Sequence, residues 1–271
     1  MAEASQIPMP VPAPRVNRML DAVVARGPAL AAVAGLLLLW QGVVWFFEVP
    51  EYMAPSPVAV LNAFQENAGT LWLNFWPTFF EAALGFVAGN LVAIALAVWF
   101  VHNTTAERAF FPIAVFINTI PIIALAPVLV LIFGNGFAPK IIIAGLICFF
   151  PTLVNMVRGL KAVSPATLDL MRVLSASNWE IFWKVRLQSS LPFLFAALKI
   201  ASTTCVIGAI VAEWIGSNFG LGALIIEATF NFRSPLLYAT VFTAALLAVV
   251  MFALVSFAEA KLIRWKTSDV H

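Results

Sequence analysis

Long apolar segments are the feature of this sequence that most limits what it can fold into. Each is about 20 residues long or longer, which is enough for an α-helix to cross the hydrocarbon core of a bilayer. Only 10% of the residues are charged and the mean hydropathy is +0.98, whereas about a quarter of a soluble domain is charged. We therefore predict an all-α membrane protein with six transmembrane helices. The expected spans are approximately 28–47, 76–101, 109–133, 137–158, 191–214 and 236–262.

The basic residues between these spans predict how the chain is oriented. Alternate connections, together with the two ends, hold 12 Lys and Arg residues on one side against two on the other. Lys and Arg concentrate on the cytoplasmic side of membrane proteins. We therefore expect both termini and the connection 158–190 to be cytoplasmic, and the connections 48–75 and 215–235 to face outward.

The predicted domain organisation follows from the same segments. Residues 1–27 form a cytoplasmic tail, in which Arg15–Arg26 has the apolar spacing of an interfacial helix; a flexible basic tail is the alternative. Residues 28–265 form the six-span transmembrane domain, with a long cytoplasmic loop at 159–190. Residues 266–271 form a second cytoplasmic tail.

Several functional classes are not supported by any motif. The chain has no G-x-x-x-x-G-K-[ST] motif, so a P-loop for ATP is absent. No Ser/His/Asp grouping, paired carboxylates or metal-ligand spacing stands out, and no concentrated basic face suits nucleic acid. We expect no catalytic residue, no metal and no cofactor bound by this chain.

The loop sequence "LDLMRVLSASNWEIFWKVRLQ" (Leu168–Gln188) is unusually apolar for a connection in water. A helix that starts near Ser164 or Pro165 is predicted to continue to about Leu174. "SASN" then interrupts it, because these side chains compete for backbone hydrogen bonds. A second short helix would group three aromatic residues at spacings of three and four. These aromatics either dock on a partner or pack on this protein's own helix ends or the lipid interface. They are Trp179, Phe182 and Trp183.

The same loop resembles the EAA loop of permease subunits of ABC importers. Asp169, Leu170 and Met171 stand at the Glu-Ala-Ala positions, Ser175 at the glycine, and Leu187-Gln188 at Leu-Pro. Both alanines, the glycine and the proline are therefore replaced, and Ser175 leaves open whether this turn needs a positive φ. Three other segments resemble the family as well: Tyr52–Phe64, Thr119–Ile141 and Val211–Ile225.

This resemblance implies a fold, partners and a location. The fold would be that of a type I ABC importer permease in a bacterial inner membrane. Two copies of the chain would enclose one path, with two ATPase subunits that use ATP and Mg²⁺ in the cytoplasm and a substrate-binding protein outside. The loop would be the coupling helix that contacts the ATPase. The resemblance implies that Asp169 and Arg172 shape the loop. The implied contact residues are Ser175, Ala176, Ser177, Asn178, Trp179 and Phe182.

The implied substrates are small nutrients. Within the importers, the chain is most similar to the group for nitrate, sulfonates, taurine and thiamine-precursor pyrimidines. The segments "DLMR", "LICFFPTLVN" and "VAEW" favour the pyrimidine branch. A self-contained secondary transporter is the alternative function, although no inverted repeat is apparent in the six spans.

Polar residues within the spans are candidates for the translocation path, because they are costly in lipid. Lys199, Thr203 and Glu213 share one sector of the fifth span. The alternatives are that Lys199 reaches the cytoplasmic interface and that Glu213 lies in outer headgroup water. In the third span, Asn118 and Thr119 precede Pro121, where a kinked helix suits a gate or a substrate contact; irregular packing is the alternative there.

Overall fold

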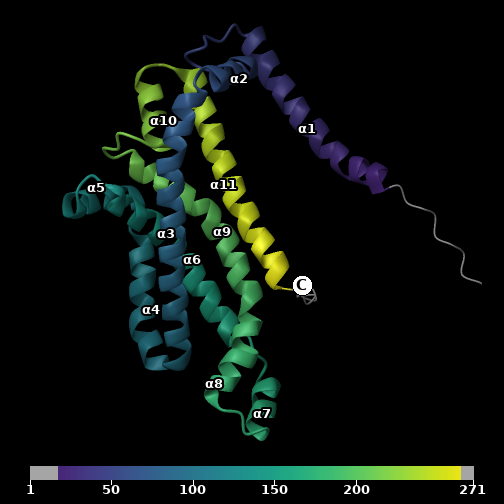
Figure 1. Cartoon of the computed structure of the whole chain (residues 1–271), viewed down its shortest axis with the longest axis vertical. Helices are drawn as coiled ribbons and strands as arrows, with labels where there is room; N and C mark the ends of the chain where they lie inside the picture. Colours follow the sequence, from purple (N-terminus) through teal and green to yellow (C-terminus); the bar gives the residue numbers. More distant parts are fainter. Residues whose placement is uncertain (1–17, 264–271) are drawn as a thin grey trace, which may run out of the picture. The chain divides into compact units, whose positions relative to one another are not determined.

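The computed structural model describes residues 18–263, and every regular element among them is a helix (Figure 1). The predicted all-α class is therefore confirmed. The contacts divide the chain into two units, residues 1–50 and 51–271. The helices are α1 (Arg18–Phe46), α2 (Pro57–Glu66), α3 (Ala68–His102), α4 (Thr104–Thr119), α5 (Ile122–Phe133), α6 (Phe137–Lys161), α7 (Pro165–Val173), α8 (Asn178–Ile181), a π-helical turn (Phe182–Arg186), α9 (Leu187–Glu213), α10 (Leu221–Phe230) and α11 (Ser234–Leu262).

Four of the described helical segments are long and apolar enough to cross a membrane, and α4 with α5 makes up to five. The apolar part of α1, Leu30–Phe46, belongs to the shorter apolar helices. The six-span count and the cytoplasmic position of both termini thus stay predictions. The four long segments are Ala68–His102, Phe137–Lys161, Asn178–Glu213 and Ser234–Leu262.

The first unit contains one described helix, α1. Arg18–Arg26 is not a separate helix but runs without a break into the first predicted span, and Pro28 lies inside the helix. The remaining residues of the two predicted tails, 1–17 and 266–271, lie outside the described part of the chain. The domain limits at 27/28 and 265/266 therefore stay predictions.

In the second unit, α6 is the central helix and packs most extensively against α3 and α9. Small residues bring α3 and α6 close together. A Cβ atom on Gly85 would lie 2.5 Å from the Cβ of Ala144 and 2.8 Å from the carbonyl oxygen of Ile141, so a side chain there would force the helices apart. The free cysteines Cys148 and Cys205 are fully buried within this core.

The third predicted span, 109–133, differs from expectation. It is not one kinked helix: α4 and α5 meet at an angle of 98°. Pro121 lacks a backbone N–H and disfavours helical backbone at the residue before it, and Ile120 is accordingly extended, with φ −71° and ψ 125°. Pro127, by contrast, stays inside α5. The break between α4 and α5 lines a pocket together with residues of α6.

Candidate functional sites

Both predicted helices of the cytoplasmic loop are present, and each has a serine cap. Ser164 accepts a hydrogen bond from the backbone N–H of Thr167 at 3.2 Å and begins α7. Ser177 and Glu180 form a reciprocal capping box that begins α8. The Ser177 backbone N–H, with help from Lys184, lowers the pKa of Glu180 to about 2. The box is therefore fully formed above the ordinary carboxylate pKa of 4.5 and is lost only as the pH falls towards 2.

Ser175 lies in the turn between α7 and α8, where the sequence left open whether the backbone needs a positive φ. Ser175 has a φ of +55°, which is the left-handed region that favours glycine. Its N–H donates to the carbonyl of Arg172 at 2.9 Å, and the N–H of Ala176 donates to Met171 at 3.0 Å. These two bonds form a Schellman motif, the usual glycine-bearing end of a helix. The positive φ is thus kept although serine occupies the position.

Replacing Ser175 with glycine is expected to stabilise this turn by about 1 kcal/mol, because an L-residue pays roughly that cost in the left-handed region. Amide hydrogen exchange at Ala176 and Asn178 in the purified protein measures the effect. Ser175→Ala is the matched control, since it removes the hydroxyl and keeps the strain. Exchange that is equally fast in the glycine and alanine variants would show that the conformation carries no cost.

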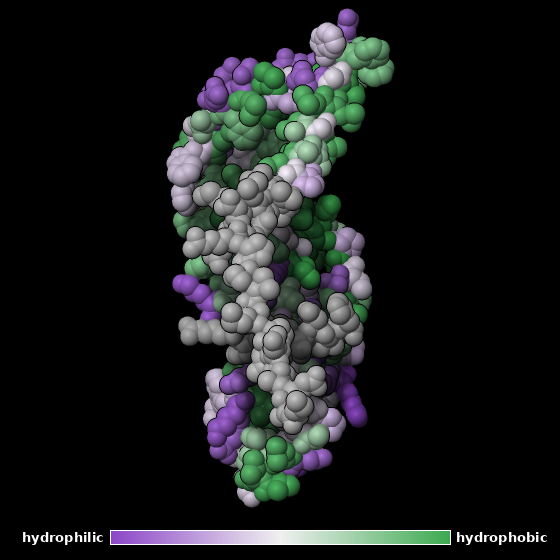
Figure 2. All heavy atoms as spheres, turned by 90° about the vertical axis from the view of Figure 1, so that its right-hand side faces the viewer, coloured by the Kyte–Doolittle hydropathy of each residue, from purple (hydrophilic) through white to green (hydrophobic). Residues whose placement is uncertain are grey.

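An exposed apolar surface covers this end of the molecule, and we call it the coupling patch. Trp179 is 66% exposed and Val173 80% exposed, although both sit on a loop predicted to lie in water. Figure 2 shows hydrophobic side chains gathered at the lower end of the view, where Figure 1 places α7 and α8. Apolar groups in such a position indicate a docking surface. The patch consists of Leu170, Val173, Leu174, Trp179 and Trp183.

Phe182 does not belong to the coupling patch, in contrast to the expectation that it makes the contact. Its side chain is 5% exposed and packs into the core formed by α3, α4 and α6. The ring centroids of Phe182 and His102 lie 5.1 Å apart, and those of Trp179 and Phe182 lie 6.1 Å apart. Because Phe182 lies one turn from Trp179 on the inner side of the helix, it holds the patch in place rather than forming part of it.

The other five predicted loop residues belong to the same loop as the patch. Asp169 and Arg172 form an ion pair at 2.7 Å in which both side chains are well exposed, so it contributes little stability. Arg172, Ala176 and Asn178 line a pocket of about 270 Å³ beside His102. Ser177 is the cap already described. These residues shape the loop around the coupling patch.

The coupling patch is joined directly to a membrane-spanning helix. The π-helical turn Phe182–Arg186 runs into α9 with helical backbone at the junction, where Leu187 has φ −62° and ψ −44°. Asn178–Glu213 is accordingly one continuous apolar helical segment of 36 residues, roughly 50 Å long. Trp179 and Trp183 of the patch therefore lie on the same continuous helical segment as α9.

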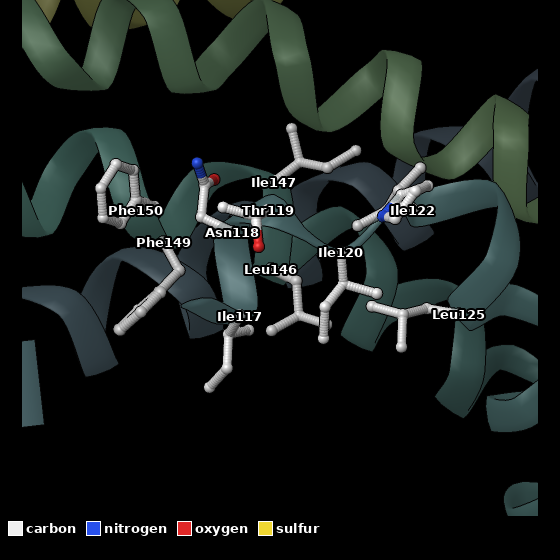
Figure 3. Close-up of a pocket in the computed structure, with 11 residues that line it drawn as sticks. Ile117, Asn118, Thr119, Ile120, Ile122, Leu125, Leu146, Ile147, Phe149 and Phe150 are labelled. Carbon is white, nitrogen blue, oxygen red and sulfur yellow. The ribbon is translucent and has the colours of Figure 1, made fainter. Parts of the chain in front are cut away.

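The break between α4 and α5 brings three of the predicted path residues together. Asn118, Thr119 and Pro121 line a pocket of about 330 Å³ with residues of α6 (Figure 3). The Thr119 hydroxyl donates to the carbonyl of Phe116 at 2.7 Å, so the hydroxyl hydrogen is not free to bind a ligand. The pocket is half-open on the single chain, and its other lining residues are all apolar.

The three predicted path residues of α9 do not line this pocket. Lys199 forms an ion pair with Glu259 of α11, and the Thr203 hydroxyl donates to the carbonyl of Ile200 at 2.9 Å. Glu213 is only 1% exposed. Their place on the path stays a prediction.

Glu213 instead caps α10. One carboxylate oxygen accepts from the Thr78 hydroxyl at 2.6 Å, and the other accepts from the backbone N–H of Gly222 at 2.5 Å. The N–H of Leu221 in turn donates to the Thr78 oxygen at 2.8 Å. A Cβ atom on Gly220, whose φ is +119°, would collide with the Glu213 carboxylate. The Gly-Leu-Gly sequence is therefore required for α10 to approach this cap.

An ion pair beside this cap escaped the sequence prediction. Lys140, near the start of the predicted span 137–158, lies in the first turn of α6 and pairs with Glu81 of α3 at 3.0 Å. The side chains are 10% and 0% exposed. Lys140 also donates to the Ser217 hydroxyl at 2.7 Å. The available signal was that Glu81 lies within a span, where a charge needs a partner.

Comparison with known proteins supports the same architecture. The model of the family described as "binding-protein-dependent transport system inner membrane component" matches residues 85–266. An inward-facing structure of the MetNI methionine ABC transporter aligns with a TM-score of 0.53 at 22% identity, covering 73% of this chain and 94% of that chain. At this identity the likeness supports the fold alone.

Three curated relatives are similar over most of the chain. The riboflavin transport system permease protein RibX of Chloroflexus aurantiacus is 31% identical and covers 89% of this chain and 92% of the relative. The formylaminopyrimidine transport permease protein ThiX of Halalkalibacterium halodurans is 32% identical, with coverage of 85% and 92%. The putative aliphatic sulfonates transport permease protein SsuC of Bacillus subtilis is 26% identical, with coverage of 90% and 88%.

Proposed function

This chain belongs to the family of binding-protein-dependent transport system inner membrane components, and from that premise we propose that it forms the membrane path of an ATP-driven importer for one small nutrient. It is an ABC importer permease subunit and a multi-pass inner membrane protein. Permease components of this family generally carry no catalytic site and work with an ATPase and a substrate-binding protein.

The coupling patch is the observation that carries the proposal. A soluble loop that exposes two tryptophans and three aliphatic side chains needs a partner to cover them. The buried Phe182 and the capping box at Ser177 hold this surface rigid in the absence of that partner. Its occupant in the proposed complex is the ATPase subunit, which binds ATP and Mg²⁺ and moves the patch when it closes.

In the proposed assembly, two copies of the chain enclose one path and each copy contacts one ATPase. Closure of the ATPases displaces the two coupling patches, and the continuous helix from Asn178 to Glu213 carries the displacement into the membrane. A binding protein delivers the substrate from outside. The substrate passes the pocket at the α4–α5 break and leaves into the cytoplasm.

The nutrient belongs to one of two classes. The first is a thiamine-precursor pyrimidine or another planar vitamin, and the second is a small compound with an anionic group, such as a sulfonate, taurine or nitrate. Relatives named for both kinds of substrate are similar to this chain.

Purification and reconstitution test the proposed function. We expect the full chain, co-expressed with an ABC ATPase subunit and a substrate-binding protein from the same organism, to retain the ATPase through purification. In proteoliposomes, uptake should require ATP on the cytoplasmic side and should be unaffected when ion gradients are collapsed. Uptake by the chain alone, driven by an ion gradient, would identify a self-contained secondary transporter and overturn the proposal.

A further inference from the structure

Asn118 places its side-chain amide at a position where an amide without hydrogen-bond partners would cost free energy. It is exposed on the single chain, and its side chain makes no hydrogen bond to the rest of residues 18–263. The pocket that it lines includes Phe149, which lies 12 residues from either end of α6, or roughly 18 Å from each. An amide facing lipid at that depth would lack hydrogen-bond partners at a cost of a few kcal/mol. The Asn118 side chain therefore faces water, a ligand or a second copy.

The surroundings of Asn118 are aromatic, aliphatic and uncharged. Figure 3 shows the amide of Asn118 beside the ring of Phe150, with Phe149 on the same side of the pocket. None of the eleven lining residues carries a charge. The helix break also leaves the first backbone N–H groups of α5 without helical partners, and Pro121, the residue before the helix, supplies no side-chain cap. The pocket thus offers flat apolar walls with a few hydrogen-bonding groups.

These features discriminate between the two classes of substrate. A sulfonate or nitrate ion would lose its hydration here and gain no cationic side chain, which makes its passage costly. An uncharged aromatic ring with nitrogen and amino substituents would lie against the phenylalanines and pair with an amide, which both donates and accepts hydrogen bonds. The pocket volume of about 330 Å³ falls at the lower end of the range for small-molecule sites.

We propose that the substrate is an uncharged, planar, hydrogen-bonding heteroaromatic ring and that Asn118 is the residue of this subunit that recognises it in the membrane. This inference rests on the proposed importer function and adds to it the class of substrate. The neighbouring Thr119 cannot donate a hydrogen bond to the substrate as the Asn118 amide can, because the Thr119 hydroxyl already donates to the Phe116 carbonyl.

Uptake by variants of the complete transporter tests the assignment. The probes are an aminopyrimidine, riboflavin, taurine and nitrate, each offered to ATP-loaded proteoliposomes with the binding protein present. We expect ATP-driven uptake of one of the two ring compounds, and Asn118→Leu should lower it about tenfold, the effect of losing one good hydrogen bond. Thr243→Val is the matched control, because its hydroxyl donates to Ala239 of the same helix at 2.8 Å and lies outside the pocket.

A labelling experiment gives a second readout that does not depend on transport. Cys148 and Cys205 are fully buried, so a water-soluble thiol reagent should modify only the new thiol of Asn118→Cys. We expect labelling in the assembled transporter and protection by the transported ring compound.

The outcomes separate this inference from the proposed function. ATP-driven uptake of taurine or nitrate would overturn the ligand class and leave the importer function intact. Unchanged uptake in Asn118→Leu, or a disulfide formed between the Asn118→Cys residues of two copies, would overturn the role of Asn118. Uptake that needs no ATPase would overturn the proposed function instead.

Discussion

Trp179→Ala is expected to lower ATP-driven uptake at least about tenfold while the chain still inserts and accumulates in the membrane. Trp179 is 66% exposed on the coupling patch, and tryptophans at protein interfaces commonly contribute about 2–4 kcal/mol to binding. Losing that much affinity for the ATPase separates ATP hydrolysis from movement of the transmembrane helices. Uptake and ATP hydrolysis measured on the same proteoliposomes report the two activities separately.

Two further variants sharpen this prediction. Ala176→Asp places a charge beside the patch and should uncouple in the same way. Trp72→Ala is the matched control, because Trp72 is 61% exposed but belongs to α3, far along the chain from the loop. Trp72→Ala should leave coupling intact. Normal transport by both loop variants would show that α7 and α8 form only a connection.

Lys140→Met is expected to destabilise the folded chain by about 3–5 kcal/mol, because it leaves the Glu81 carboxylate buried without its partner. The Lys140–Glu81 distance is 3.0 Å and the Glu81 side chain is fully buried. The double variant Glu81→Met/Lys140→Met should recover most of this loss, since a buried ion pair and an apolar pair of similar size differ little in free energy. Cys148 and Cys205, buried in the folded chain, allow a thiol-reactive dye to follow thermal unfolding.

Lys161→Met supplies the control for this second prediction. Lys161 and Glu107 form a pair at 2.6 Å, but their side chains are 45% and 22% exposed, so breaking it should cost no more than about 1 kcal/mol. A Lys140→Met protein that unfolds at the same temperature as Lys161→Met would show that the pair at the start of α6 is not the stabilising contact proposed.

Local sequence signals predicted the parts of the loop that depend on neighbours in the chain. Ser164 and the run Ser175–Asn178 indicated where α7 begins and where it is interrupted, and both helices are present with serine caps. The spacing of the aromatic residues correctly placed Trp179 and Trp183 close together, with ring centroids 5.4 Å apart. Such features involve residues at most four positions apart, so the sequence contains all the interacting groups.

Contacts between distant segments could not be predicted in the same way. Nothing near Phe182 in the sequence indicates that its ring meets His102, 80 positions earlier. The pair of Lys140 with Glu81 likewise joins helices whose register depends on glycine contacts along α3 and α6. The prolines at 121 and 127 looked alike in the sequence, yet only the first breaks the helix.

The sequence by itself determined that much of this protein lies in lipid, that its fold is helical, and where the short helices of its cytoplasmic loop begin and end. These follow from apolar length, charge distribution and capping residues, which act through lipid and through neighbours in the chain. Only the tertiary structure decided which aromatic side chain is buried, which charges pair in the membrane, and that Asn118 lies beside phenylalanine rings in an uncharged pocket. The physical reason is that burial and pairing depend on how α3, α6 and α9 pack, and close packing is a property of all three helices together.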